Sequence, residues 1–178
     1  MASGTATATS WDSTSVKADV TPLEPALRAR VEDFLTDYAH RLDDGRIDDW
    51  TGFFTQDTLY QITTRENFEA GYPIGILLCK GKGMMEDRVL ALKTANVFEP
   101  HTHCHILGRP MLEALPGGEI GARSNFSVYR TMESGATELF AIGKYLDRIV
   151  LEAGEPRFKE RRVILDSRCV DVLLVFPL

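Results

Sequence analysis

The chain has 178 residues, of which 44% are hydrophobic, and it carries a formal net charge of −6 at pH 7. This length and composition suit one domain of average size that can bury a hydrophobic core. The acidic balance argues against nucleic acid or an anionic membrane surface as the main partner. No apolar run approaches the length of a membrane-spanning helix, so we expect neither a nucleic-acid nor a membrane partner.

The first 20 residues differ in composition from the rest of the chain. They are rich in Ala, Ser and Thr, and they contain neither the basic nor the apolar region of a secretory signal. We therefore predict a disordered tail at 1–20 and a single α+β domain at 21–178. Within the tail, Trp11 is a candidate anchor that folds back or docks on a partner, although a solvated tail is the simpler expectation.

The three cysteines, Cys79, Cys104 and Cys169, are odd in number and widely spaced, and no C-x-x-C pair occurs. This pattern favours neither a disulfide framework nor a structural zinc site. Free thiols are typical of a reducing compartment. We therefore predict a cytoplasmic protein.

Helical periodicity dominates the beginning of the domain. Thr21, Pro22 and Glu24 match a capping box with proline at the first helical position, and Gly45 suits a helix end. These signals predict an amphipathic helix over 22–44. Its apolar side consists of Leu27, Val31, Phe34, Leu35, Tyr38 and Leu42.

The middle of the chain mixes short elements. We predict a short helix around 47–54, a strand at 58–64, a loop at 66–74, and a third helix over 84–96. Strands follow to the end, at 101–115, 119–133, 137–151, 157–167 and 169–176, with glycine-containing turns between most of them. Helices followed by long antiparallel strands indicate an α+β fold, with helices on one face of a curved sheet.

Three of the four histidines, His101, His103 and His105, stand at alternate positions of one predicted strand. Alternate side chains of a strand share a face, so the three imidazoles should lie in a row. Such a row suits a metal site, a proton-handling site or a polar seam in an interface. A metal site needs further ligands that the sequence does not identify, and the alternatives stay open at this point.

A second set of residues could carry catalysis. Asp87 on the third helix could act as a general base beside His103 and Tyr60, as in the pocket of a small dehydratase or isomerase. The simpler interpretation is an exposed carboxylate in a helix salt bridge. The cations of the segment 159–162 are similarly expected to be solvated or paired across strands or subunits.

Several cofactor motifs are absent from the sequence. It lacks the C-x-H and C-x-x-H pattern of a Rieske cluster and the spacing of a mononuclear iron site. It also lacks G-x-G-x-x-G and G-x-S-x-G. We therefore expect no cofactor in this chain.

Several short segments share their order and spacing with one known family. They are Asp87-Arg88, Ala91-Leu92, Ala95-Asn96, 105–108, 126–128, Phe140-Ala141, 143–147, 161–167 and 171–178. By these segments, roughly residues 24–178 resemble the small (β) subunits of bacterial aromatic-ring-hydroxylating dioxygenases. The chain most resembles the branch acting on aromatic carboxylic acids, such as terephthalate, anthranilate or salicylate.

The resemblance implies a nuclear-transport-factor-2-like cone, with N-terminal helices packed on a long, strongly curved, mostly antiparallel sheet. It also implies a non-catalytic assembly subunit. In that family a large α subunit carries the Rieske iron–sulfur cluster and the mononuclear Fe(II), and a reductase or ferredoxin delivers electrons through it. The partners would be this α subunit and other copies of the chain, in a three-fold hetero-hexamer.

The resemblance gives the histidine strand a role between subunits. The residues expected at such interfaces are His101, His103, His105, Arg109, Arg161, Phe176 and Leu178. Members of the family often carry arginine just before the matching histidine, whereas His103 and Cys104 stand here, so no specific arginine contact is carried over.

Three hypotheses therefore remain in order of preference. The first is the structural subunit of a dioxygenase active in aromatic catabolism. The second is a stand-alone dehydratase or isomerase that uses Asp87, His103 and Tyr60. The third is a homo-oligomeric module that binds a small molecule without catalysis. A pull-down of a larger iron–sulfur protein, loss of activity in Asp87→Asn, and ligand affinity of the isolated chain discriminate among them.

Overall fold

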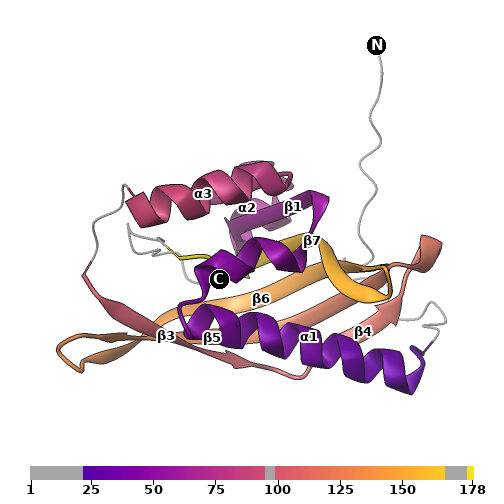
Figure 1. Cartoon of the computed structure of the whole chain (residues 1–178), viewed down its shortest axis with the longest axis horizontal. Coiled ribbons are helices and arrows are strands. Elements are labelled where there is room, and N and C mark those ends of the chain that lie inside the picture. The colour runs from indigo at the N-terminus through magenta and orange to yellow at the C-terminus, as the bar shows by residue number, and fades with distance from the viewer. Residues whose placement is uncertain (1–21, 95–98, 167–175) are drawn as a thin grey trace, which may run out of the picture.

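The computed structural model describes residues 22–94, 99–166 and 176–178 (Figure 1). The helices are α1 (Pro25–Asp43), the 3-10 helix η1 (Ile47–Phe53), α2 (Arg65–Glu69), α3 (Lys82–Thr94) and the short 3-10 turn η2 (Pro116–Gly118). The strands are β1 (Phe54–Thr64), β2 (Leu77–Lys80), β3 (His101–Leu107), β4 (Met111–Ala114), β5 (Ile120–Met132), β6 (Thr137–Glu152) and β7 (Glu155–Leu165).

The described strands form a seven-stranded mixed sheet. Its order is β2-β1-β7-β6-β5-β3, and β4 also pairs with β5. Strands β1 and β7 run parallel, whereas the other neighbouring pairs are antiparallel. The predicted α+β class and the mostly antiparallel sheet are thus confirmed. Register shifts interrupt the β1–β7, β5–β6 and β6–β7 pairings, as β-bulges do where strands bend or twist more strongly.

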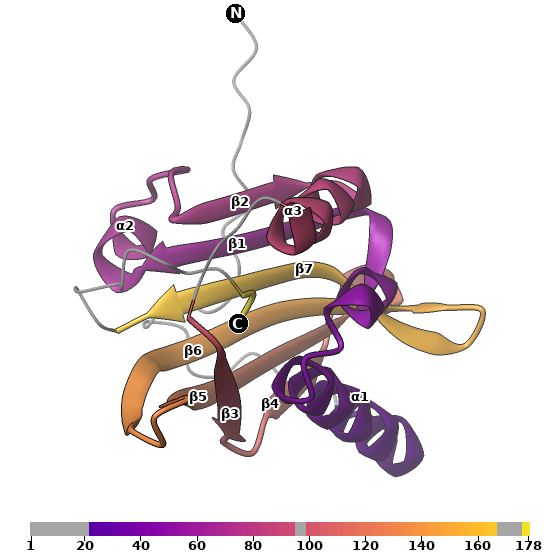
Figure 2. The ribbon, with the colours of Figure 1, turned by 60° about the vertical axis from the view of Figure 1, so that its left-hand side comes forward.

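The two long helices cover one face of this sheet. Helix α1 packs over β3 and β7, and α3 packs over β1 and β2 (Figure 2). The predicted apolar side of α1 is confirmed, since Val31, Phe34, Leu35, Tyr38 and Leu42 are buried and Leu27 packs against them. On α3, Met85 and Leu92 are buried, and Val89 packs against the core. None of the described helices is long and apolar enough to cross a membrane.

The start of α1 differs from the prediction by one turn. The helix begins at Pro25, and the Glu24 side chain caps it by accepting a hydrogen bond from the Leu27 backbone N–H at 3.0 Å. The predicted cap at Thr21 is therefore wrong. Pro25 stands at the first helical position, where its missing N–H costs no hydrogen bond, and the Glu24 carboxylate caps this start.

Two other boundaries also differ. The predicted loop at 66–74 contains α2, because the Thr64 hydroxyl accepts from the Asn67 N–H at 3.3 Å and caps a short helix. The predicted strand at 101–115 is divided into β3 and β4 by Gly108-Arg109-Pro110, since proline cannot donate to a sheet ladder. The predicted tail at 1–20 and the strand at 169–176, apart from Phe176, lie outside the described residues.

Candidate functional site

The interior between α1 and the sheet is filled by a cluster centred on Arg161. This side chain comes from β7 and is only 1% exposed. Its guanidinium carbon lies 4.2 Å from the ring centre of Tyr38, 3.8 Å from that of Tyr145 and 4.6 Å from that of Phe158. Three aromatic faces around one cation form a cation–π cage, which stabilises the charge where water is excluded.

Asp147 on β6 provides the opposite charge. It stands directly across from Arg161 in the β6–β7 register, and its Oδ2 lies 3.7 Å from Arg161 Nη1. Burial raises the pKa of Asp147 to about 7, and the attraction of Arg161 opposes this shift. Burial lowers the pKa of Arg161, but Asp147 and the surrounding tyrosines more than offset this effect and leave it raised. The guanidinium therefore stays charged inside the protein.

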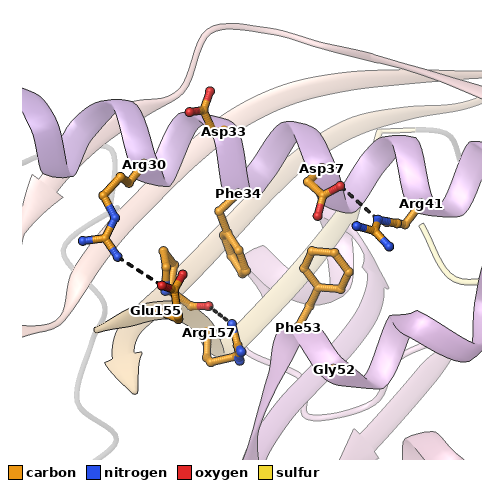
Figure 3. Close-up of a pocket in the computed structure, with 10 residues that line it drawn as sticks. Arg30, Asp33, Phe34, Asp37, Arg41, Gly52, Phe53, Glu155 and Arg157 are labelled. Carbon is orange, nitrogen blue, oxygen red and sulfur yellow. Dashed lines mark hydrogen bonds and ion pairs between the residues drawn. The ribbon is translucent and has the colours of Figure 1, made fainter. Parts of the chain in front are cut away.

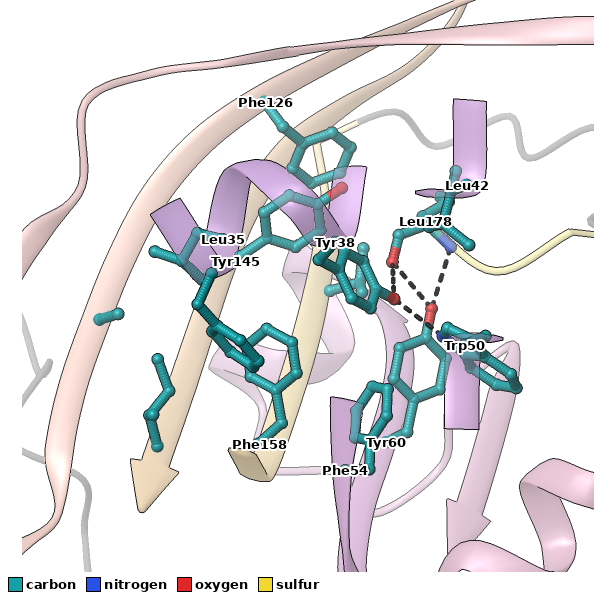
Figure 4. Close-up of a cluster of buried hydrophobic side chains, with 14 of the residues drawn as sticks. Leu35, Tyr38, Leu42, Trp50, Phe54, Tyr60, Phe126, Tyr145, Phe158 and Leu178 are labelled. Carbon is teal, nitrogen blue, oxygen red and sulfur yellow. Dashed lines mark hydrogen bonds between the residues drawn. The ribbon is translucent and has the colours of Figure 1, made fainter. Parts of the chain in front are cut away.

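A hydrogen-bond network closes the same interior beside Leu178 (Figure 4). The Tyr38 and Tyr60 hydroxyls donate to the Leu178 carbonyl oxygen at 3.2 and 2.9 Å. The Leu178 N–H donates back to the Tyr60 hydroxyl at 3.0 Å, and Trp50 Nε1 donates to the Tyr38 hydroxyl at 2.9 Å. Burial raises the pKa of Tyr38 to about 12 and also raises that of Tyr60, so both hydroxyls remain neutral donors.

This packing bears on the residues of the dehydratase hypothesis. Tyr60 is fully buried, and its hydroxyl is engaged by Leu178. Asp87 is exposed on α3, while His103 is half-buried on β3. None of the three residues lines either of the two surface grooves described below. A base exposed to bulk water on a helix has no buried substrate to deprotonate. A hydroxyl that is bonded to both the backbone N–H and the backbone oxygen of Leu178 has limited freedom to act as an acid.

The histidine strand behaves as predicted in one respect. The side chains of His101, His103 and His105 share one face, whereas the alternate residues Thr102, Cys104 and Ile106 are exposed. The ring centres of His101 and His103 are 4.8 Å apart. The strand therefore places three imidazoles in a row on the side that α1 covers.

Each histidine has a different environment. His105 is buried, and its Nδ1 lies 2.5 Å from Asp43 Oδ1, while its backbone N–H donates to Asp43 Oδ2 at 2.8 Å. His103 packs against the rings of Phe140 and Phe176, with centroids 5.2 and 5.7 Å away. Burial, followed by the neighbouring His101 and His105, lowers the pKa of His103 to about 4. His103 is thus a neutral, largely aromatic contact at physiological pH.

The seven residues predicted at subunit interfaces divide into two groups. Arg161, Leu178 and His105 are buried within the single chain, and their assignment to an interface stays a prediction. The burial of Arg161 cannot be read from the charged segment 159–162, because the rings that enclose it come from residues far away in the sequence. His101, His103 and Phe176 are half-buried, and Arg109 is exposed.

Two surface grooves are present among the described residues. The larger, about 450 Å³, lies between α1, the end of η1 and the β6–β7 turn (Figure 3). Its walls are mainly charged, with Arg30, Asp33, Asp37, Arg41, Glu155 and Arg157 around Phe34 and Phe53. The smaller, about 220 Å³, lies between α1 and the β3–β4 bend and includes Arg109. Opposite charges balance along the larger groove, so it favours no ligand of one sign.

Metal ligands are not gathered in the part of the chain that the structure describes. No three His, Cys, Asp or Glu side chains lie close enough to hold one ion there. The His101–His103 pair packs against Phe140 and Phe176. The donor set of the histidine strand therefore does not match a zinc or non-haem iron site.

Comparison with known proteins supplies the family. The family model for the ring hydroxylating beta subunit matches residues 38–172. The chain belongs to this family. It is 37% identical over 141 residues to the anthranilate 1,2-dioxygenase small subunit of Burkholderia cepacia, covering 79% of this chain and 88% of that protein. It is also 37% identical to a terminal oxygenase beta subunit of terephthalate 1,2-dioxygenase from Comamonas, covering 79% and 92%.

Solved structures agree with this membership. A beta subunit assigned to an aromatic-ring-hydroxylating dioxygenase of Novosphingobium aromaticivorans superposes with a TM-score of 0.79 at 35% identity, covering 86% of this chain and 97% of that one. ActVI-ORFA from Streptomyces coelicolor superposes with a TM-score of 0.63 at 18% identity, covering 79% and 98%. The second likeness shows a shared fold alone.

Some residues of the beta subunit's interior were missed by sequence reasoning. Asp43 closes α1 and binds β3, yet nothing local marks it among neighbouring acidic residues. The sequence indicates the burial of Arg161 only weakly. Arg161 alternates with the buried Val163 and Leu165 along β7 and so shares their face of the sheet. Its pairing with Asp147 agrees with the expectation that cations of this segment pair across strands.

Proposed function

We propose that this beta subunit is the non-catalytic assembly subunit of a Rieske non-haem iron oxygenase that dihydroxylates an aromatic carboxylic acid. The names of the two curated relatives, which act on anthranilate and terephthalate, support an aromatic-acid substrate. The large α subunit would carry the Rieske cluster and the mononuclear Fe(II), and it would receive electrons from a reductase or ferredoxin. The complex would act in the cytoplasm.

The observation that carries the proposal is the filled interior. Arg161 is enclosed by Tyr38, Tyr145 and Phe158. The hydroxyls of Tyr38 and Tyr60 both donate hydrogen bonds to Leu178. An enzyme of this fold class needs a cavity with convergent polar groups. Because the protein's own rings surround this cation, we infer that the interior side chains stabilise the fold and do not bind a substrate.

The assembly we propose is a three-fold hetero-hexamer. In it the beta subunits, as strongly curved cones, contact the α subunits and also contact one another. The rim of the histidine strand, formed by His101, His103 and Phe176 with Arg109 beyond it, is the proposed seam. These side chains are half-buried or exposed in the single chain. Covering a partly exposed aromatic and imidazole surface releases water and adds to complex stability.

The test is co-expression of the chain with the large oxygenase subunit of the same organism. We expect a stable complex that contains iron and, with its reductase, hydroxylates an aromatic carboxylic acid. The chain alone should show neither turnover nor iron. Turnover of a small molecule by the isolated chain, lost in Asp87→Asn, would instead establish the dehydratase or isomerase hypothesis.

The seam has its own test within the same complex. The variant His103→Ala should reduce the amount of α subunit or of further beta subunits that remain bound during gel filtration, without changing the iron content per α subunit. His40→Ala, on the exposed side of α1, is the matched control. Equal assembly of both variants would place the seam elsewhere.

A further inference from the structure

The segment between α2 and β2 exposes three large apolar side chains. Tyr72 is 61% exposed, Ile74 is 70% exposed and Ile76 is 43% exposed. We call these three residues the apolar ridge. The segment lies along the outer side of the sheet edge, where the chain passes from α2 to β2 (Figure 2). Single exposed hydrophobic residues are ordinary, but three within five positions indicate a contact surface.

The backbone beneath the ridge is held firmly to β1. The Gln61 side-chain amide donates to the Pro73 carbonyl oxygen at 3.4 Å, and the Thr63 hydroxyl donates to the Ile74 carbonyl oxygen at 3.3 Å. The Ile76 N–H donates to a carbonyl oxygen of β1 at 2.7 Å. Gln61 and Thr63 are themselves buried, so the strand uses interior polar groups to fix this segment.

Gly75 shows how closely the segment lies on the strand. A Cβ at this position would come within 2.5 Å of the Ile62 carbonyl oxygen, which is backbone and cannot move aside. Only glycine therefore allows the approach. A segment that is fixed from below and still exposes Tyr72 and Ile74 loses little further conformational entropy when a partner covers it, which is the property of a preorganised binding surface.

The chemistry around the ridge restricts its partner. Glu66 and Glu69 on α2 are exposed next to it, and the Tyr72 N–H donates to the Asn67 carbonyl oxygen of that helix at 2.9 Å, which fixes the two surfaces together. In a three-fold assembly the contacts between copies are heterologous, so the ridge would need a complementary apolar site elsewhere on another copy of the chain. Neither groove described above offers an apolar slot, since one is lined by charges and the other is small.

We propose that the apolar ridge docks into an apolar groove, rimmed by Lys or Arg side chains, on the large α subunit. This inference rests on the proposed function and adds a specific contact to it. Tyr72 would be the principal anchor, because buried aromatic residues dominate binding energy at interfaces. The carboxylates of Glu66 and Glu69 would meet the basic rim and steer the encounter.

The experiment uses the tagged chain co-expressed with its large subunit. Ile74→Asp places a charge on the ridge, and Met111→Asp, at an apolar residue of β4 that is 64% exposed, is the matched control. We expect Ile74→Asp to retain about tenfold less large subunit than the unaltered chain, and the control to stay within about twofold. The melting temperature and oligomeric state of the isolated variant should match those of Met111→Asp.

A charge reversal tests the rim separately. The double variant Glu66→Lys, Glu69→Lys should weaken retention by about two- to fivefold at low salt and lessen its dependence on salt. Retention of the large subunit by Ile74→Asp at the unaltered level would overturn the inference alone. A change confined to self-association of the isolated chain would also overturn it, by assigning the ridge to a second copy. If the unaltered chain retains no large subunit, the proposed function itself fails, and this inference fails with it.

Discussion

Two ionisable side chains on the covered face of this sheet illustrate opposite solutions to burial. Arg161 keeps its charge, because three aromatic rings and Asp147 replace the water around it. His103 sits between Phe140 and Phe176 beside another imidazole, and its lowered pKa leaves it neutral. The first environment is built from residues of the same chain. The second lies at the rim and remains half-covered, which fits a surface that a neighbouring subunit completes.

The largest expected loss of stability comes from removing the Arg161 side chain. Arg161→Ala should lower the free energy of unfolding of the isolated chain by about 3 to 5 kcal/mol, since it leaves Asp147 buried without its partner. Urea denaturation measures this loss. The double variant Arg161→Met, Asp147→Leu should recover most of it. Arg162→Ala removes a partly exposed ion pair with Glu160 and should cost less than about 1 kcal/mol; equal losses for both arginines would contradict the cage.

A smaller loss is expected where the interior meets Leu178. Tyr60→Phe removes the hydroxyl that both donates to and accepts from this residue, and it should cost about 1 to 3 kcal/mol by leaving a buried peptide group unsatisfied. Tyr129→Phe, on a residue that is 40% exposed, is the control and should change stability by less than about 0.5 kcal/mol. Indistinguishable midpoints for the two variants in thermal unfolding would argue against the network.

At the rim, Asp43 links α1 to the histidine strand. Asp43→Ala removes both contacts to His105 and should lower stability by about 1 to 2 kcal/mol. Asp44→Ala, at the exposed neighbouring carboxylate, should cost less than about 0.5 kcal/mol. Hydrogen exchange of the His105 amide provides a local readout, because its protection should fall in the first variant only. Unchanged protection would mean that the carboxylate does not hold the strand.

The last effect concerns the dependence of stability on pH, and the two regions should act with opposite sign. For Asp147, with an ordinary pKa of 3.8 raised to about 7, the folded chain binds more protons between these values. Stability from this group therefore falls as pH rises through that window. For His103, lowered from 6.5 to about 4, the unfolded chain binds more protons between these values, so its contribution rises with pH.

A single substitution separates these opposing terms. His103→Gln should make the free energy of unfolding fall more steeply with pH between about 4 and 6.5, by less than about 1.4 kcal/mol per pH unit. Urea titrations at several pH values measure the slope, and His40→Gln is the control on an exposed site. A flatter slope in His103→Gln than in the unaltered chain would reverse the assigned direction of the His103 shift.

Much of the architecture follows from local pattern. The apolar side of α1, the short helix at Ile47–Phe53 and the long strands β5, β6 and β7 could be predicted, because each repeats its pattern over several turns or residues. The shared face of His101, His103 and His105 follows from strand geometry in the same way. Boundaries set by one capping group, such as the Glu24 carboxylate, were less predictable, since competing caps stand nearby.

The sequence by itself determined the α+β class, the histidine row and, through segments spread along the chain, the resemblance to ring-hydroxylating beta subunits. Only the tertiary structure decided that Arg161 is caged, that His105 is tied to Asp43, and that Tyr72, Ile74 and Ile76 are exposed over a fixed backbone. The physical reason is that burial depends on residues far apart in the chain. A strand pattern gives the face of a side chain, whereas the fold decides what covers that face.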